Sequence, residues 1–197
     1  MASITGAALT ALLQSCAPQV APSTMHAIVA VESGGNPWAI GDNTTRRSFA
    51  PRSYAEAVAT ANALIAQGHS VDVGIAQVNS ANFAGYHTNA AQVLIPCQGL
   101  IVGSEILANA YRWSVATNPE PRQALWGAVS AYNTGSLYAG ARYVNLVVSA
   151  AQQNPLVPPI EILAPVTPPS SGRIEPQKPQ PKPTPDFAYS TNVPEIK

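Results

Sequence analysis

The chain has 197 residues, a formal net charge of zero at neutral pH and 46% hydrophobic residues. A chain of this size and composition holds enough apolar side chains for one globular domain with a sizeable core. Its neutral charge excludes the basic surface that nucleic acid or anionic lipid requires, and residues 1–25 are too often interrupted by polar residues and prolines to span a membrane. We expect a monomer with neutral or mildly polar partners, no bound nucleic acid and no membrane span.

The first predicted element is a helix over residues 3–16. Within it, ITGAALTALL resembles a short signal-peptide core and LLQSC resembles a lipoprotein cleavage box, but no Lys or Arg precedes either. We therefore interpret the segment as part of the folded domain, which means that no export signal is evident in this chain.

Two cysteines, Cys16 and Cys97, each lie near a proline at the boundary of a predicted element. A disulfide between them would close a long loop and stabilise the fold by up to ~4.5 kcal/mol in the chain-entropy description. Two buried thiols are the alternative, and export to an oxidising compartment would favour the bridge. Because His26, His69 and His87 are scattered, they give no zinc-binding spacing, and we expect no metal site and no cofactor.

The middle of the chain predicts helices and a little strand. A second helix runs from Ser23 to the glycines at 34–35, because Met25, Ile28 and Val29 recur at helical spacing. A Ser followed by Glu three residues later, at 53 and 56, matches a capping box and opens a helix that stops near residue 68. The run VDVGIAQVN at 71–79 has strand character, and we expect it to pair with WAI at 38–40.

Further helices are predicted over residues 98–117, 123–131 and 136–153, the first of them ended by the prolines at 119 and 121. Residues 1–154 should therefore form one mainly α domain with one small β-hairpin. Residues 155–197 hold 12 of the 19 prolines and all three lysines. This composition predicts a disordered Pro-rich tail, and a ligand for a Pro-recognising partner is the alternative.

Residues 1–154 contain only six carboxylates, and five of them have a structural explanation. Glu56 completes the capping box, and Glu120 stands at a helix start, where a negative charge suits the helix dipole. Asp42 lies in a predicted turn, Asp72 begins the strand-like run, and Glu105 takes a solvated position on the long helix.

Glu32 has no such explanation. It follows Ile28 by four residues and Met25 by seven, so it falls on the apolar face of its helix and near the negative end of the helix dipole. Burial and the dipole both disfavour a charged carboxylate, so we expect a raised pKa and a side chain that can act as a general acid. A helix-end glutamate that reaches into water is the alternative.

Several short motifs follow the helix that ends at Glu32. They are ES at 32–33 with NPWA at 36–39, GIAQ at 74–77, AYNTG at 131–135 and YV at 143–144. In this order they resemble the lytic transglycosylases of the soluble transglycosylase, goose-type lysozyme-like group. The resemblance covers residues 16–148 and is closest to the enzymes associated with type IV secretion and conjugation, which the sequences around both cysteines also resemble.

The resemblance implies a lysozyme-like fold and cleavage of the β-1,4 bond between N-acetylmuramic acid and N-acetylglucosamine, with a 1,6-anhydro product. It implies that Glu32 is the single catalytic residue, that Ser33 holds the glutamate or a substrate group, that Gln77 and Asn133 bind the sugars, and that Tyr143 contacts or orients them. The alternatives are backbone-bonding turn residues for Gln77 and Asn133 and a core aromatic for Tyr143.

The resemblance also implies a place of action. The substrate would be peptidoglycan glycan strands in the periplasm, opened locally for a type IV secretion apparatus whose components the tail could bind. One rival is a muramidase that uses water, in which Asp42 or Asp72 would position the nucleophile, since ordinary glycoside hydrolysis needs two carboxylates. A second rival is a slow, wall-binding scaffold for assembly of the secretion channel.

Overall fold

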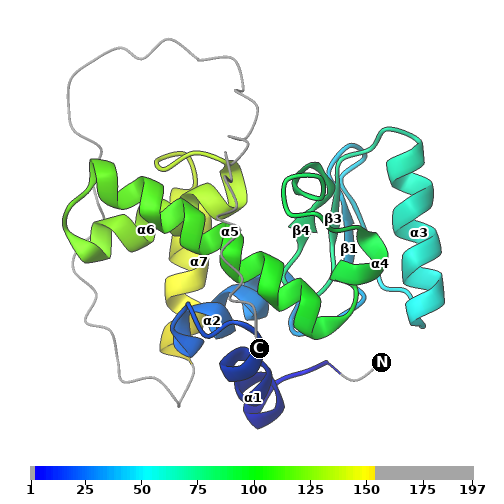
Figure 1. Ribbon diagram of the computed structural model, residues 1–197, viewed down its shortest axis with the longest axis horizontal. Coiled ribbons are helices and arrows are strands. Elements are labelled where there is room, and N and C mark those ends of the chain that lie inside the picture. Colours follow the sequence, from blue (N-terminus) through cyan, green and yellow to red (C-terminus); the bar gives the residue numbers. More distant parts are fainter. Residues whose placement is uncertain (1–2, 154–197) are drawn as a thin grey trace, which may run out of the picture. The chain divides into compact units, whose positions relative to one another are not determined.

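The computed structural model describes residues 3–153, and within this range the chain is mainly helical with a small antiparallel sheet (Figure 1). The predicted fold class is therefore confirmed. The Pro-rich tail predicted at 155–197 lies outside the described residues. None of the helices within residues 3–153 combines the length and the apolar character needed to cross a membrane.

The helices agree with the predicted ones to within a few residues at most ends. They are α1 (Gly6–Cys16), α2 (Pro22–Glu32), α3 (Tyr54–Ala66), α4 (Ala90–Val93), α5 (Pro96–Thr117), α6 (Pro121–Thr134) and α7 (Ala141–Gln152), with a short 3-10 turn at Ser80–Asn82.

The last helix begins later than residue 136, where the sequence places its start. Ser130 of α6 causes the difference, because its hydroxyl donates to the carbonyl of Ser136 at 2.6 Å and accepts from the amide of Gly140 at 2.8 Å. These two hydrogen bonds hold residues 136–140 as a loop, so the helix starts after Gly140.

The sheet has four short strands, β1 (Ile40–Asp42), β2 (Arg47–Phe49), β3 (Val71–Val73) and β4 (Val78–Asn79), in the order β2-β1-β3-β4. The expected pairing of residues 38–40 with 71–79 is confirmed, since Ile40 is the partner of Val73 in an antiparallel ladder. The single hairpin of the prediction is thus extended by a strand on each side. Helix α3 packs against β1 and β3 on the outer side of the sheet (Figure 1).

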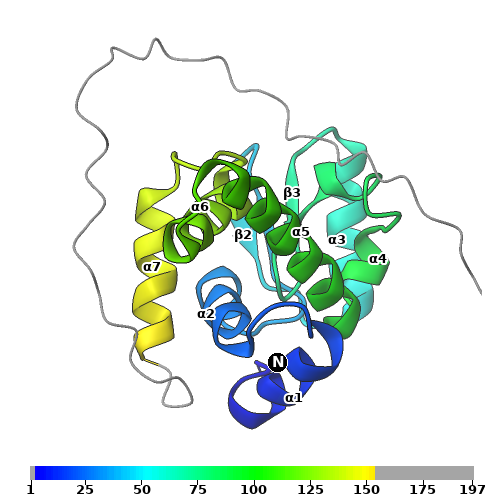
Figure 2. The ribbon, with the colours of Figure 1, turned by 60° about the vertical axis from the view of Figure 1, so that its left-hand side comes forward.

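Helix α2 lies among the other helices and packs against α1 and α7 (Figure 2). Its side chains Met25, Ile28 and Val29 have no exposed surface, which confirms the predicted apolar face. Helix α1 belongs to the same core, because Leu9 and Leu13 are each only 1% exposed. The first predicted helix is therefore present and contributes to the core.

A disulfide joins Cys16, at the end of α1, to Cys97, at the start of α5. The two Cα atoms lie 5.4 Å apart, and 81 residues separate the cysteines in sequence. The bond therefore ties the first helix to the long central helix.

Candidate active site

Glu32 is the last residue of α2 and is partly buried. The buried apolar face of α2 sets the helix in the core, and this placement directs the side chain at its C-terminal end into the domain. The hydroxyl of Tyr143, on α7, donates a hydrogen bond to Oε1 of Glu32. Residues 111 positions apart in sequence are thus in direct contact.

Tyr143 is a buried donor, with 8% of its surface exposed. Burial raises the pKa of its hydroxyl far above the usual range, and the nearby charge of Glu32 raises it further. The phenol therefore keeps its proton near neutral pH and fixes the orientation of the Glu32 carboxyl group.

Ser33 ties the end of α2 to the turn at residues 74–77. Its hydroxyl donates to the carbonyl of Ile75 at 2.7 Å and accepts from the amide of Gly35 at 3.1 Å. Both Gly34 and Gly35 have positive φ, at 59° and 80°, so the chain turns sharply just after Glu32. Ser33 therefore fixes the backbone that carries the glutamate.

The turn at residues 74–77 requires glycine at its first position. Gly74 has a φ of 80°, and a Cβ there would lie 2.8 Å from the carbonyl oxygen of Val93. Gln77 closes the turn with a φ of 47°, and its Nε2 donates to the carbonyls of Ala39 and Gly74 at 3.0 and 2.8 Å. The amide nitrogen of Gln77 thus braces the backbone, as the alternative interpretation supposed, and its carbonyl oxygen is the group left for a ligand.

Tyr132 holds the same turn from the other side. It is buried, and its hydroxyl donates to the carbonyl of Ala76 at 2.6 Å. Gly103 of α5 makes room, because a Cβ there would lie 2.7 Å from the Cβ of Ala76 and 3.0 Å from the Tyr132 hydroxyl. A buried tyrosine usually needs a partner for its hydroxyl, and the carbonyl of Ala76 is that partner here.

Asn133 follows Tyr132 at the C-terminal end of α6 and is exposed. Its side chain makes no hydrogen bond with the rest of residues 3–153. Gly135, in the left-handed region at φ 72°, ends the helix just after it. Of the five predicted site residues, Glu32 and Tyr143 are therefore joined directly by a hydrogen bond. The turn at 74–77 is hydrogen-bonded to Ser33 and to Tyr132, which precedes Asn133.

The five other carboxylates in the described range have structural surroundings. The Asp42 carboxylate is 2% exposed and accepts from the amides of Thr44 and Thr45, at 3.0 and 3.3 Å, and from the Thr45 hydroxyl at 2.5 Å. It also lies 2.9 Å from Nδ1 of His69. The hydrogen bond from the Thr45 hydroxyl is the main cause that lowers the pKa of Asp42 to about 2.

Asp72 is bound by two amides instead of opening a strand. Its two carboxylate oxygens accept from Asn43 and Asn79, each at 2.7 Å. It lies in the middle of β3, opposite Gly41 and Asn79. Asp72 therefore joins three segments of the sheet region.

The predicted cap of α3 is confirmed, and Glu120 lies at a helix start as expected. Ser53 accepts from the amide of Glu56 at 3.1 Å, and the Glu56 carboxylate accepts from the amide of Arg52 at 2.8 Å. Glu120 accepts from two amides at the start of α6, at 3.1 and 2.7 Å. Glu105 is exposed on α5, as expected.

Among residues 3–153, no group of three or more His, Cys, Asp or Glu side chains lies close enough together to bind a metal ion. Both cysteines are in the disulfide, and His69 is engaged with Asp42. The groups that remain for chemistry near Glu32 are a carboxyl, a phenol, amides and hydroxyls.

Residues 11–145 match the family described as the transglycosylase SLT domain. The chain belongs to this family. The matched range contains Glu32, Ser33, Gln77, Asn133 and Tyr143. The resemblance that the sequence motifs carry is therefore confirmed for the part of the SLT chain that holds the candidate site.

Two relatives of this SLT chain carry the name virB1, and the name of the first refers to type IV secretion. The chain is 44% identical over 148 residues to the type IV secretion system protein virB1 of Brucella abortus, a match covering 71% of this chain and 62% of the relative. It is 40% identical over 149 residues to protein virB1 of Agrobacterium fabrum, covering 75% of this chain and 60% of the relative. The SLT chain thus spans about three fifths of the length of these relatives, and no solved structure gives a significant match.

Proposed function

We propose that the protein is a peptidoglycan lytic transglycosylase whose acid and base is Glu32. The observation that carries the proposal is the contrast among the six carboxylates of residues 3–153. Asp42, Asp72, Glu56 and Glu120 are bound by backbone or amide groups, and Glu105 is exposed on a helix surface. Glu32 alone among the six accepts from a buried phenol beside a sharp turn.

The chemistry needs one such group. Glu32 in its protonated form gives its proton to the glycosidic oxygen as the bond from that oxygen to C1 of N-acetylmuramic acid breaks. The C6 hydroxyl of the same sugar then forms a bond to C1, and the Glu32 carboxylate takes the hydroxyl proton. No water is consumed, and the product is a 1,6-anhydro sugar.

The neighbouring residues support these two proton transfers. Tyr143 keeps one carboxyl oxygen in place, and Ser33 fixes the backbone beside it. The carbonyl oxygen of Gln77 and the exposed amide of Asn133 are suited to the hydroxyl and N-acetyl groups of sugars on either side of the broken bond. Correct placement of the sugar is itself a large part of catalysis, because the attacking hydroxyl belongs to the substrate.

The setting that we propose is the periplasm, where the protein opens the wall locally for a type IV secretion apparatus. The link to type IV secretion is supported by the name of its relative in Brucella, the type IV secretion system protein virB1, and the relative in Agrobacterium shares the name virB1. A disulfide between α1 and α5 suits an oxidising compartment.

A muramidase that uses water is the second candidate. It would need a further carboxylate to activate that water. Asp42 is held by a turn and by His69, and Asp72 by two asparagine amides, so each already serves the sheet region. These contacts favour the anhydro route. A wall-binding scaffold, the other rival, would not need the contact between Glu32 and Tyr143.

The decisive experiment is mass analysis of products from purified peptidoglycan. The full chain should release fragments that are lighter by one water than fragments with reducing ends, and reducing ends would identify a muramidase. Glu32→Gln should abolish clearing of a cell-wall suspension while wall binding and the helical circular dichroism spectrum persist. Glu105→Gln, at an exposed position of α5, is the matched control and should clear normally. Equal clearing by Glu32→Gln would refute the assignment of the acid.

A further inference from the structure

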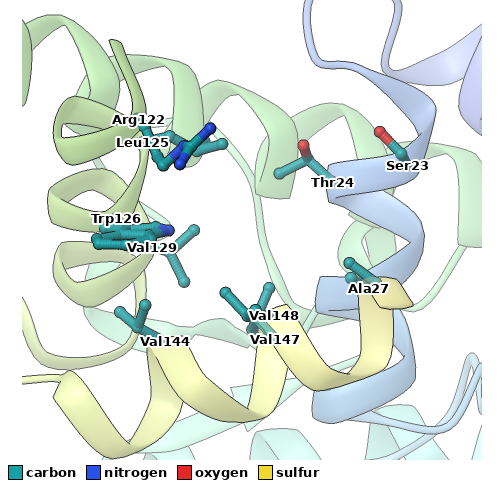
Figure 3. A pocket seen from close by; sticks show the side chains of 11 residues that line it. Ser23, Thr24, Ala27, Arg122, Leu125, Trp126, Val129, Val144, Val147 and Val148 are labelled. Carbon is teal, nitrogen blue, oxygen red and sulfur yellow. The ribbon is translucent and has the colours of Figure 1, made fainter. Parts of the chain in front are cut away.

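A groove lies between α2, α6 and α7, lined mainly by apolar side chains (Figure 3). We call it the α2–α6–α7 groove. Its lining comprises Ser23, Thr24 and Ala27 of α2, Arg122, Leu125, Trp126 and Val129 of α6, and Val144, Val147, Val148 and Ala151 of α7.

The groove is separate from the candidate active site. It uses the first half of α2, and Glu32 lies at the other end of that helix, about 13 Å along the axis from Ser23. None of the five predicted site residues lines it. The proposed transglycosylase chemistry therefore leaves the groove without a role.

One positive charge stands at this apolar surface. Arg122 is the one charged residue among those that line the groove. Its Nη1 is buried with no hydrogen-bond partner, and within residues 3–153 its guanidinium forms no ion pair. A buried guanidinium nitrogen without a partner is costly, so a ligand that brings a carboxylate to it gains more than one that buries apolar surface alone.

The chain itself continues from the edge of the groove. Ala151 is the last groove residue on α7, and the sequence then runs as LVPPIEILA over residues 156–164. This segment joins Ile160, Ile162 and Leu163 to a single acid, Glu161. The segment thus complements the groove in two ways: both are mainly apolar, and the negative charge of Glu161 is opposite to the positive charge of Arg122.

The linking length is sufficient. Ile160 lies seven positions after Gln153 in sequence, which allows a reach of up to about 23 Å for extended backbone. The groove residues of α7, from Val144 to Ala151, span only about 10 Å along their helix. This reach is therefore longer than the part of the groove that α7 lines.

We propose that residues 160–163 dock in the α2–α6–α7 groove, with the Ile and Leu side chains against Trp126 and the valines of α7 and with Glu161 paired to Arg122. This interaction would anchor the start of the Pro-rich region beside the N-terminal half of α2, and Glu32 lies at the C-terminal end of the same helix. It does not rest on the proposed function.

The test uses the indole N–H signals of the full chain in NMR, where Trp126→Phe identifies the Trp126 signal among the three tryptophans. Ile162→Ser with Leu163→Ser should move the Trp126 signal and leave those of Trp38 and Trp113 in place. Ile174→Ser with Ile196→Ser, two apolar tail residues outside the segment, is the matched control and should change none of the three.

Charge reversal tests the pair itself. Glu161→Arg should move the Trp126 signal in the same direction as the Ile162 and Leu163 changes, and adding Arg122→Glu should restore it. If Arg122→Glu prevents folding, Glu161→Gln still reports on the pair, because it removes the negative charge and leaves Arg122 unchanged.

Two outcomes would overturn the proposal. A Trp126 signal that is identical in the full chain and in the Ile162 and Leu163 variant would show that the segment does not cover the groove. A Trp126 signal that moves with protein concentration in both proteins would show that a second copy of the chain occupies it instead.

Discussion

At the scale of single residues, the contact between Tyr143 and Glu32 is the central feature of the proposed site. The two side chains come from helices that pack together, yet 111 positions separate them in sequence. Periodicity and capping patterns describe neighbours along the chain, so they predict the apolar face of α2 and leave the partner of Glu32 undetermined. The sequence pointed to Tyr143 only through the resemblance to a family.

Tyr143→Phe should test the orienting role of this phenol. The variant keeps the buried ring and removes the hydroxyl that donates to Glu32. We expect kcat for release of anhydro fragments to fall by on the order of tenfold or more, because a general acid must be held within hydrogen-bond reach of its target, while KM stays nearly constant.

The matched control for this prediction is Tyr138→Phe, since Tyr138 is 72% exposed. That variant should turn over as the wild type does. A Tyr143→Phe protein with unchanged kcat would mean that the phenol packs against Glu32 without orienting it.

At the scale of the elements, helices were predicted well and strands poorly, for a physical reason. The caps of α3 and α6 are made by Ser53, Glu56 and Glu120 with backbone groups at most four positions away, so local sequence describes them. Strands β2 and β4 have only three and two residues and form by pairing with β1 and β3, which lie elsewhere in the chain. The loop before α7 likewise depends on Ser130, six and ten positions away.

The turn after β1 gives a prediction about acid stability. The pKa of Asp42 is about 2 in the folded protein against an ordinary 3.8, chiefly because the Thr45 hydroxyl donates to its carboxylate. A lowered pKa means that the folded state favours the ionised form, so its contribution to stability is complete above about pH 4 and is lost as the pH falls toward about 2. Asp42→Asn should lower the free energy of unfolding near neutral pH and flatten its decline between these two values.

Urea unfolding of both proteins at several pH values in this window measures the effect. Glu105→Gln, at an exposed carboxylate, should run parallel to the wild type throughout. Parallel curves for Asp42→Asn as well would show that the turn does not depend on the ionised carboxylate.

At the scale of the whole domain, the disulfide between Cys16 and Cys97 is the main covalent constraint in residues 3–153. It closes a loop across a separation of 81 residues and joins α1 to α5. Replacing both cysteines by Ser should lower the free energy of unfolding by up to about 4.5 kcal/mol, because the unfolded chain regains the entropy of an open loop.

Chemical denaturation with and without dithiothreitol checks this prediction. The reductant should destabilise the wild type and leave the double variant unaffected. A wild type that unfolds at the same denaturant concentration in both conditions would show that the bond adds nothing to stability.

The start of the domain also touches the loop that follows Glu32. The amide of Ile4 donates to the carbonyl of Gly35 at 2.8 Å, and a Cβ on Gly35 would lie 2.2 Å from the carbonyl oxygen of Ile4. A fluorophore, affinity tag or surface linker attached ahead of Ile4 would therefore sit next to the loop that follows Glu32, and we expect it to disturb turnover by the proposed site. The better attachment point for immobilising the protein is beyond α7, which ends near the first turns of α2 and away from that loop.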